Sequence, residues 1–306
     1  MYQSPRPLGP PPNYTLRRAV AATGLVLVLY LLFRIFSALF GGDGGGEERL
    51  STATTTSTST TAMTLQAPPA CEYLDEQSIY SNVDDWQRTI VDTAYALPDA
   101  YEPPDLVPAS QAGYSAEYRV RRLVIEDLNA LREAIIAADV PEVALLAAYR
   151  SMEDQAALFA QREQELGFAE AAKGTARPGH SDHHLGTTVD FRPIGATDVD
   201  QEFGATPTGQ WLEEHSWEYG FILTYPEGEE ETTCYKYEPW HFRYVGRDLA
   251  RQVHASGLTL REYLWHWEVT GTPPGASTSA VTSTTAGDAT GEDDADAESG
   301  EGGGEG

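Results

Sequence analysis

A run of chemically active side chains, residues 180–190, limits the possible folds of this chain more than any other segment. It reads His-Ser-Asp-His-His-Leu-Gly-Thr-Thr-Val-Asp. On a helix, His183 and Asp190 would lie on one face, two turns apart. Gly186 and the β-branched residues that follow it favour instead a turn that leads into a strand. The prediction is a loop-to-strand unit with His183 at the loop edge and Asp190 on the strand, converging on one point.

A second segment, Glu238-Pro-Trp-His241, follows further along the chain. Pro239 excludes a regular helix interior, so this is not the helical His-Glu-x-x-His arrangement. Two histidines, one aspartate and a spare glutamate match the needs of a catalytic zinc site, which takes three ligands and leaves one position open. The alternative is a hydrogen-bonded core histidine and a capping aspartate.

The two segments together resemble the D-alanyl-D-alanine carboxypeptidase family of zinc peptidases (VanY-type, M15). The family pattern is Ser-x-His-x-x-Gly-x-Ala-x-Asp, followed much later by Glu-x-x-His. The matching residues are Ser181, His183, Gly186, Asp190, Glu238 and His241. Thr188 departs from the pattern at the alanine position. The resemblance implies Zn²⁺ bound by His183, Asp190 and His241, with Glu238 as the general base.

The resemblance extends to Tyr-Arg-Ser-x-x-x-Gln, which begins here at Tyr149. It implies substrate binding by Arg150, Gln155 and Ser181. Arginine offers a planar fork for a terminal carboxylate, and Arg150 is also expected to act on the developing oxyanion. The alternatives are a structural salt bridge for Arg150 and a backbone hydrogen bond for Ser181.

Two further histidines lie close to His183: His180 directly precedes the motif, and His184 directly follows His183. They either orient a metal ligand by hydrogen bonding to it or are loop side chains near solvent. The two cysteines, Cys71 and Cys234, form a disulfide if the domain is exported; the alternative is a pair of free thiols.

The implied fold is α+β, a small, mostly antiparallel sheet surrounded by helices (Hedgehog/DD-peptidase-like), over a zinc peptidase domain of residues 71–270. Apolar spacing predicts helices over residues 116–139, 151–167, 206–219, 247–254 and 260–267. Strands are predicted over residues 143–149, 187–191, 220–225 and 240–245. Residues 73–108 are expected to form an irregular lead-in.

The N-terminal part predicts a membrane anchor. Residues 1–18 form a basic, Pro-rich cytoplasmic tail, and residues 19–40 are almost wholly apolar, with Arg34 as the one charge. About 20 such residues span a bilayer, and the basic flank stays inside. Residues 41–70 then form a flexible linker. This predicts a single-pass protein of the cell membrane with an extracytoplasmic catalytic domain; a cleaved signal peptide is the alternative.

The net charge of -27 argues against nucleic acid as a partner, because nucleic-acid binding needs basic patches. Part of that charge lies in residues 271–306, predicted to be a disordered acidic tail. The expected partners are peptidoglycan stem peptides and, through the anchor, a lipid bilayer; the oligomeric state is not predicted.

The resemblance implies a zinc-dependent D,D-carboxypeptidase that removes terminal D-alanine from peptidoglycan stem peptides. Two alternatives stay open. One is an L,D-carboxypeptidase or endopeptidase on the same polymer. The other is a catalytically silent, zinc-bearing module that binds the wall.

Overall fold

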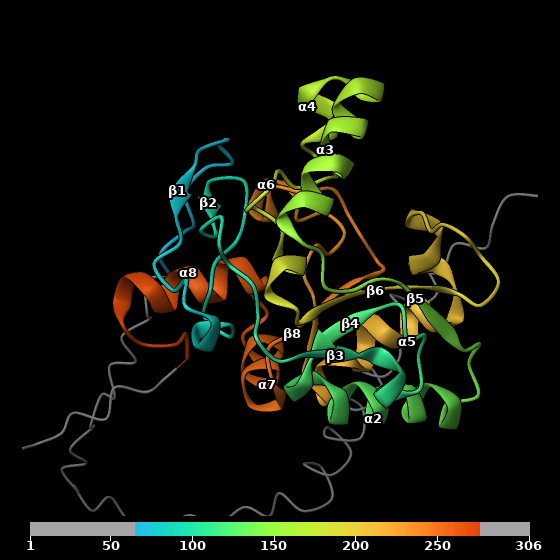
Figure 1. Ribbon diagram of the computed structural model, residues 1–306. Helices are drawn as coiled ribbons and strands as arrows, with labels where there is room; N and C mark the ends of the chain where they lie inside the picture. Colours follow the sequence, from blue (N-terminus) through green and yellow to red (C-terminus); the bar gives the residue numbers. More distant parts are fainter. Residues whose placement is uncertain (1–64, 276–306) are drawn as a thin grey trace, which may run out of the picture. The chain divides into compact units, whose positions relative to one another are not determined.

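The computed structural model describes residues 65–275, which belong to one compact unit (Figure 1). The predicted cytoplasmic tail, the apolar segment 19–40, most of the linker and residues 276–306 lie outside the described residues. Within residues 65–275, none of the helices is both long and apolar enough to cross a membrane. The anchor therefore stays a prediction.

A four-stranded antiparallel sheet lies at the centre of the unit, in the order β5-β6-β8-β7 (Figure 1). Its strands are β5 (Val143–Ala147), β6 (Thr188–Pro193), β7 (Phe221–Leu223) and β8 (His241–Tyr244). Val189 and Phe191 of the inner strand β6 have no exposed surface. On β6, Asp190 is in register with His241 of β8. The predicted α+β class with a mostly antiparallel sheet is confirmed.

Helices pack around this sheet, and shorter elements fill the edges. The α-helices are α2 (Ile125–Ala137), α3 (Met152–Leu166), α4 (Phe168–Ala171), α5 (Pro207–His215), α6 (Glu230–Thr233), α7 (Arg247–Ser256) and α8 (Leu260–Thr270). The 3-10 helices are η1 (Val83–Asp85), η2 (Ala109–Ala112), η3 (Arg122–Val124), η4 (Asp182–Leu185), η5 (Gln201–Ala205) and η6 (Ser216–Tyr219). Two small sheets pair β1 (Glu76–Gln77) with β2 (Tyr95–Ala96) and β3 (Leu106–Pro108) with β4 (Arg119–Arg121).

The predicted helix over residues 116–139 is wrong in its first part. Arg119–Arg121 forms β4, which pairs antiparallel with β3, and α2 begins only at Ile125. Val120 is fully buried in this pairing, so cross-strand packing overrides an apolar spacing that also suits a helix. The helix over residues 151–167 is confirmed as α3, and Ser151 caps it by accepting a hydrogen bond from Asp154 N at 3.1 Å.

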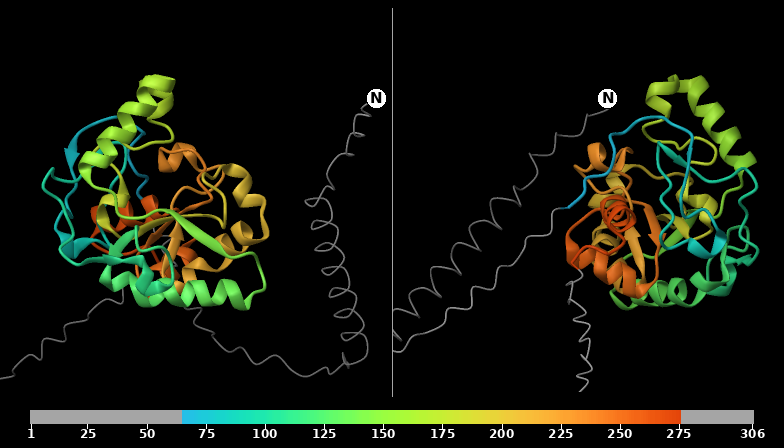
Figure 2. Two further views of the ribbon diagram at one scale, coloured as in Figure 1. Left: turned by 45° about the vertical axis from the view of Figure 1, so that its right-hand side comes forward. Right: turned by 90° about the vertical axis from the view of Figure 1, so that its left-hand side faces the viewer.

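Helices α3 and α4 project from the rest of the unit in both views of Figure 2. Gly167 joins them with a φ of +77°, a left-handed conformation that glycine adopts without strain. Leu166 and Phe168 at this junction are 55% and 40% exposed. This pair of helices, called the arm below, has one end at the sheet and the other in solvent.

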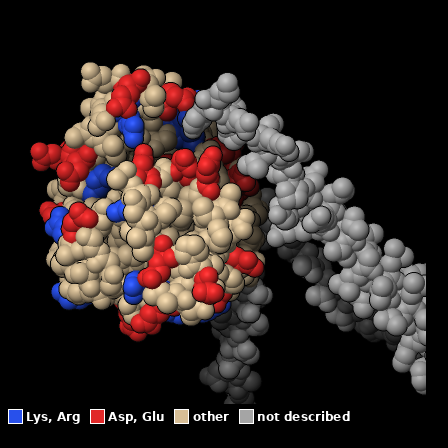
Figure 3. All heavy atoms as spheres, turned by 90° about the vertical axis from the view of Figure 1, so that its right-hand side faces the viewer, with Lys and Arg blue, Asp and Glu red and all other residues tan. Residues whose placement is uncertain are grey.

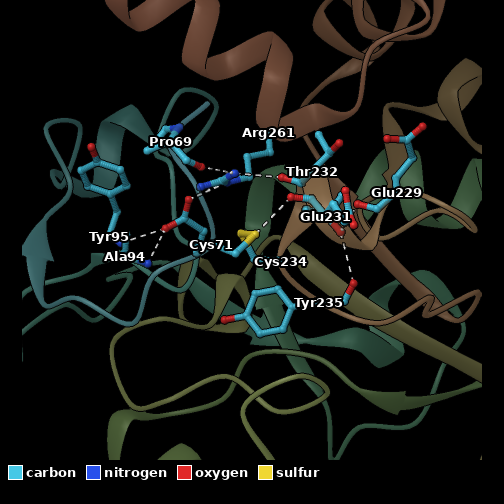
Figure 4. Close-up of a disulfide and its surroundings, with 12 residues drawn as sticks. Pro69, Cys71, Ala94, Tyr95, Glu229, Glu231, Thr232, Cys234, Tyr235 and Arg261 are labelled. Carbon is cyan, nitrogen blue, oxygen red and sulfur yellow. Dashed lines mark hydrogen bonds and ion pairs between the residues drawn. A yellow bond between two sulfur atoms is a disulfide. The ribbon is translucent and has the colours of Figure 1, made fainter. Parts of the chain in front are cut away.

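The disulfide between Cys71 and Cys234 is present, which confirms the predicted pairing. Arg261 of α8 lies beside it, buried, and pairs with Asp92 at 2.7 Å (Figure 4). Its guanidinium also donates to the carbonyls of Pro69 and Thr232. These contacts fix the start of the domain next to the segment that leads to Glu238.

Charge on the molecule's surface follows the acidic composition. On the face shown in Figure 3, acidic side chains are spread widely, with fewer basic side chains scattered among them. A surface of this kind attracts cations more readily than polyanions.

Candidate metal and catalytic site

The turn that carries His183 is stabilised at its two ends by Ser181 and Gly186. The side chain of Ser181 accepts a hydrogen bond from His183 N at 3.3 Å and opens η4. Gly186 closes η4 with a φ of +68°. A Cβ at Gly186 would meet Leu106 Cδ2 at 2.9 Å, and the positive φ would strain any side chain, so the position favours glycine. The chain then enters β6, as the sequence predicts.

His183, Asp190 and His241 come together on the sheet. His183 Nε2 lies 3.2 Å from Asp190 Oδ2, and His241 Nδ1 lies 3.0 Å from Asp190 Oδ1. The two imidazole rings meet edge to face with their centroids 4.9 Å apart. All three side chains are at least nine-tenths buried. The register of β6 against β8 produces this convergence, because it sets Asp190 opposite His241.

The other ring nitrogens are occupied. His183 Nδ1 donates to the carbonyl of Ala148 at 2.7 Å, and His241 Nε2 lies 3.0 Å from Asp182 Oδ1. A histidine whose one nitrogen donates in this way presents a lone pair on the other. The free lone pairs of His183 Nε2 and His241 Nδ1 therefore both face Asp190.

A cation fits this donor set. Asp190 Oδ1 is buried and accepts no hydrogen bond. Burial alone would raise the pKa of Asp190, but His183 and His241 in their protonated forms outweigh it and hold that pKa well below its usual range. A bound cation supplies the same positive charge and leaves both lone pairs free to act as ligands. Two nitrogens and a carboxylate oxygen are ligands typical of Zn²⁺.

Asp182, His183 and His241 also offer ligand atoms within 4.8 Å of one another. We favour the set with Asp190, because Asp182 contacts the far nitrogen of His241. Burial opposes ionisation of Asp182, yet His241 lowers its pKa to about 2. Asp182 thus orients His241 from behind, in the way that carboxylates support metal-ligating histidines. The sequence alone did not reveal this role; its one signal was an acidic residue directly before His183.

Glu238 lies at the entrance to β8 with its Oε2 at 3.6 Å from His241 Nδ1. Burial raises its pKa to about 8; His241 opposes this rise, and Asp190 and Asp182 add to it. A carboxyl group that exchanges protons near neutral pH is suited to general acid–base work.

One cavity of about 350 Å³ contains all the predicted site residues. Its lining includes Arg150, Gln155, Ser181, His183, Asp190, Glu238 and His241. Cavities of this size bind small ligands or parts of larger ones. The structure thus brings the sequence-predicted set together without exception.

Arg150 and Gln155 form one unit inside this cavity. Arg150 Nη1 donates to Gln155 Oε1 at 2.8 Å, and Gln155 Nε2 donates to the carbonyl of Ala176 at 2.6 Å. Arg150 pairs with no carboxylate among the described residues. Gln155 is fully buried, so it lies behind Arg150 and supports the guanidinium; its predicted contact with substrate stays a prediction.

His180 and His184 are buried, not near solvent. His180 Nδ1 contacts the carbonyl of Asp92 at 2.7 Å, and His184 Nδ1 contacts the carbonyl of Arg150 at 2.7 Å. Burial lowers the pKa of His184 to about 4, so its ring is neutral at pH 7. Neither histidine contacts a metal ligand's side chain in the way the sequence suggested.

Comparison with known proteins agrees with this geometry. A family model described as VanY, D-alanyl-D-alanine carboxypeptidase, matches residues 117–247. The solved structure of a vancomycin-resistance D,D-pentapeptidase VanY in complex with Zn(II) is 30% identical, with a TM-score of 0.51, over 58% of this chain and 99% of that one. The chain belongs to the VanY family of D-alanyl-D-alanine carboxypeptidases.

Other carboxypeptidases are similar to this chain to a comparable degree. The LD-carboxypeptidase LdcB is 29% identical with a TM-score of 0.52, over 64% of this chain and 98% of that one. The putative carboxypeptidase YodJ of Bacillus subtilis is 35% identical over 57% of this chain and 65% of its own length. A D-alanyl-D-alanine carboxypeptidase of Enterococcus faecium is 37% identical over 38% of this chain and 34% of its own length. The chain thus spans between about a third and two thirds of these two curated relatives.

Proposed function

We propose that this protein is a Zn²⁺-dependent D,D-carboxypeptidase that removes the terminal D-alanine from peptidoglycan stem peptides. The observation that carries the proposal is the convergence of His183 Nε2, Asp190 and His241 Nδ1 beside Glu238 in one cavity. The VanY relative that binds Zn(II) and another solved in complex with D-alanine-D-alanine support it.

His183, Asp190 and His241 would hold the ion. Zn²⁺, when bound, supplies Lewis acidity and brings the pKa of a water down to about 7. Glu238 accepts the proton of the attacking water on its carboxylate and returns it to the leaving amine of D-alanine. The new C–O bond forms first, and the C–N bond breaks once the amine takes the proton, so the products are the shortened peptide and free D-alanine. Arg150 binds the terminal carboxylate through its guanidinium.

The raised pKa of Glu238 determines the direction in which activity changes with pH. Glu238 must be ionised to accept a proton, so activity rises with pH through its pKa. That pKa is about 8 for the site residues alone, and a nearby cation lowers it by favouring the carboxylate. The expected midpoint of kcat/KM therefore lies below about 8.

The cavity favours a substrate longer than a dipeptide. It continues from Gln155 along one face of α3, where Leu158, Arg162 and Leu166 line it. Their spacing of four residues puts these side chains on one side of the helix. The arm thus offers contacts remote from the scissile bond, as a peptide attached to a polymer would need.

We further propose that residues 19–40 anchor the protein in the cell membrane, with the catalytic domain outside on the 41–70 linker. The disulfide supports this location, because disulfides persist in oxidising compartments. Protease treatment of intact cells tests it. The domain should be digested from outside, and a variant without residues 19–40 should leave the membrane fraction.

The central experiment incubates the purified protein with synthetic pentapeptide and tetrapeptide stems, with and without a chelator. Mass spectrometry should show loss of one D-alanine from the pentapeptide. Chelation should stop the reaction, and added Zn²⁺ should restore it. Glu238→Ala should keep its metal and lose hydrolysis.

Cleavage of the tetrapeptide alone would favour the L,D activity. Binding to sacculi without any hydrolysis would favour the silent wall-binding module.

A further inference from the structure

The chain just beyond strand β5 leaves the central sheet and is held by the metal-binding turn and by one hydrogen bond from Tyr149 N to the carbonyl of Arg119 in β4, at 2.9 Å. The pairing of β5 with β6 is irregular between Leu145 and Ala147 and stops there. Beyond it, His183 Nδ1 donates to the carbonyl of Ala148, and the amide of Arg150 donates to the carbonyl of His183 at 3.3 Å. Irregularities of this kind redirect a strand near functional sites.

His184 completes this set of contacts. Its Nδ1 donates to the carbonyl of Arg150 at 2.7 Å, while its Nε2 accepts from the amide of Gly179 at 3.2 Å. Both ring nitrogens are thus used inside the protein. The side chain is 1% exposed and does not line the cavity. His184 therefore has no route to direct contact with a substrate.

We propose that His184 is a positioning residue that fixes Arg150 relative to the metal site. His183 and His184 are neighbours in the same 3-10 turn. This turn therefore carries both the nitrogen that faces the metal site, on His183, and the nitrogen that binds the main chain of Arg150, on His184. Gln155 holds the guanidinium of Arg150, and His184 holds its main chain. The distance between the scissile bond and the bound carboxylate is then set by this turn. The proposal rests on the carboxylate-binding role given to Arg150 above.

The physical reason is that Arg150 lies three residues beyond Ala147, the last paired residue of β5, and has no ladder hydrogen bonds of its own. A displacement of about 1 Å in a positioning group can cost as much as 10²-fold in rate. A neutral, buried imidazole between two backbone groups restrains the main chain there with directional hydrogen bonds.

Three variants separate the two hydrogen bonds of His184. In His184→Asn, the amide nitrogen lies as many bonds from Cβ as Nδ1, so it keeps the donor to Arg150. In His184→Gln, the longer side chain reaches the amide of Gly179 but loses that donor. His184→Leu removes both.

We expect His184→Gln and His184→Leu to raise KM for a free-acid pentapeptide by about 10-fold, with bound zinc unchanged. Both should also lose selectivity for the free acid over its C-terminal amide, and His184→Asn should retain most of both properties.

His180→Leu is the matched control, because His180 is equally buried in the same segment but contacts Asp92 and not Arg150. It should lower thermal stability without changing the acid-over-amide selectivity. Crystal structures of the variants should show Arg150 displaced in His184→Gln and in place in His184→Asn.

Equal KM for the Asn and Gln variants, or equal loss of zinc in all three, would overturn the proposal. If the wild type hydrolyses no stem peptide, the proposed function fails. The crystal structures then decide the positioning role alone: an undisplaced Arg150 in His184→Gln rejects it.

Discussion

The two walls of the cavity differ in how they are built. The inner wall, made of η4, β6 and β8, holds His183, Asp190 and His241, which are 3%, 6% and 3% exposed. The outer wall is the arm, where Leu166 and Phe168 are 55% and 40% exposed. The inner wall is fixed by strand register and buried hydrogen bonds. The outer wall is held by a small buried cluster of Phe159, Ala171 and Ala172 and by exposed ion pairs.

The ion pairs that hold the outer part of the arm are weak. Glu170 of α4 pairs with Lys173 at 3.3 Å and with Lys236 across the cavity, and all three side chains are about half exposed. Exposed ion pairs of this kind contribute little to stability, because water screens them and ordering the side chains costs entropy. The difference between the walls indicates that they have different functions. The inner wall sets the chemistry and tolerates little change, while the arm adjusts which substrates bind.

The largest effect on activity should come from a substitution of Asp190, at the centre of the inner wall. Asp190→Asn removes the carboxylate that faces both histidines while keeping nearly the same volume. We expect an activity loss greater than the 10- to 100-fold typical of outer partners of a metal site, together with loss of bound zinc. Atomic absorption and peptide hydrolysis measure both. Retained zinc and activity would assign the third ligand to Asp182 instead.

A smaller effect should follow from the carboxylate behind His241. Asp182→Asn removes the charge that orients Nε2 but leaves the three proposed ligands in place. We expect metal affinity to fall about 10- to 100-fold, measured by competition with a chelator, and saturating Zn²⁺ to restore most of the activity. Failure of excess zinc to restore activity would mean that Asp182 does more than orient His241.

The inner wall was largely predictable from the sequence, because the spacing of His183 and Asp190 and the turn at Gly186 are local signals. Cys71 and Cys234 also pair as expected. The first part of the predicted 116–139 helix was wrong, since its pairing with β3 depends on residues distant in sequence. The contacts of Asp182 and His184 were not predictable for the same reason. They depend on β6 lying between β5 and β8, which no local pattern specifies.

The disulfide connects the start of the domain to the segment before Glu238, and neither cysteine lines the cavity. Cys71→Ser, with Cys234→Ser as the paired control, should lower the free energy of unfolding by about 2–5 kcal/mol. Arg261 and its buried contacts remain in these variants. We therefore expect kcat at 25 °C to change little while the melting temperature falls. Calorimetry and steady-state assays measure the two quantities. A large loss of kcat without loss of stability would place the disulfide in control of Glu238.

The smallest effect should come from the arm. Leu166→Ser removes an exposed apolar side chain that lines the cavity far from the metal site. Loss of part of one such contact is worth about 0.5–1 kcal/mol, which raises KM about 2- to 5-fold. The rise should appear for a pentapeptide and not for D-alanyl-D-alanine, because only the longer substrate reaches the arm. Ile136→Ser is the control, since Ile136 is 44% exposed on α2 and does not line the cavity. An equal rise for both substrates would mean that the arm acts on the inner wall and not on the length of the peptide.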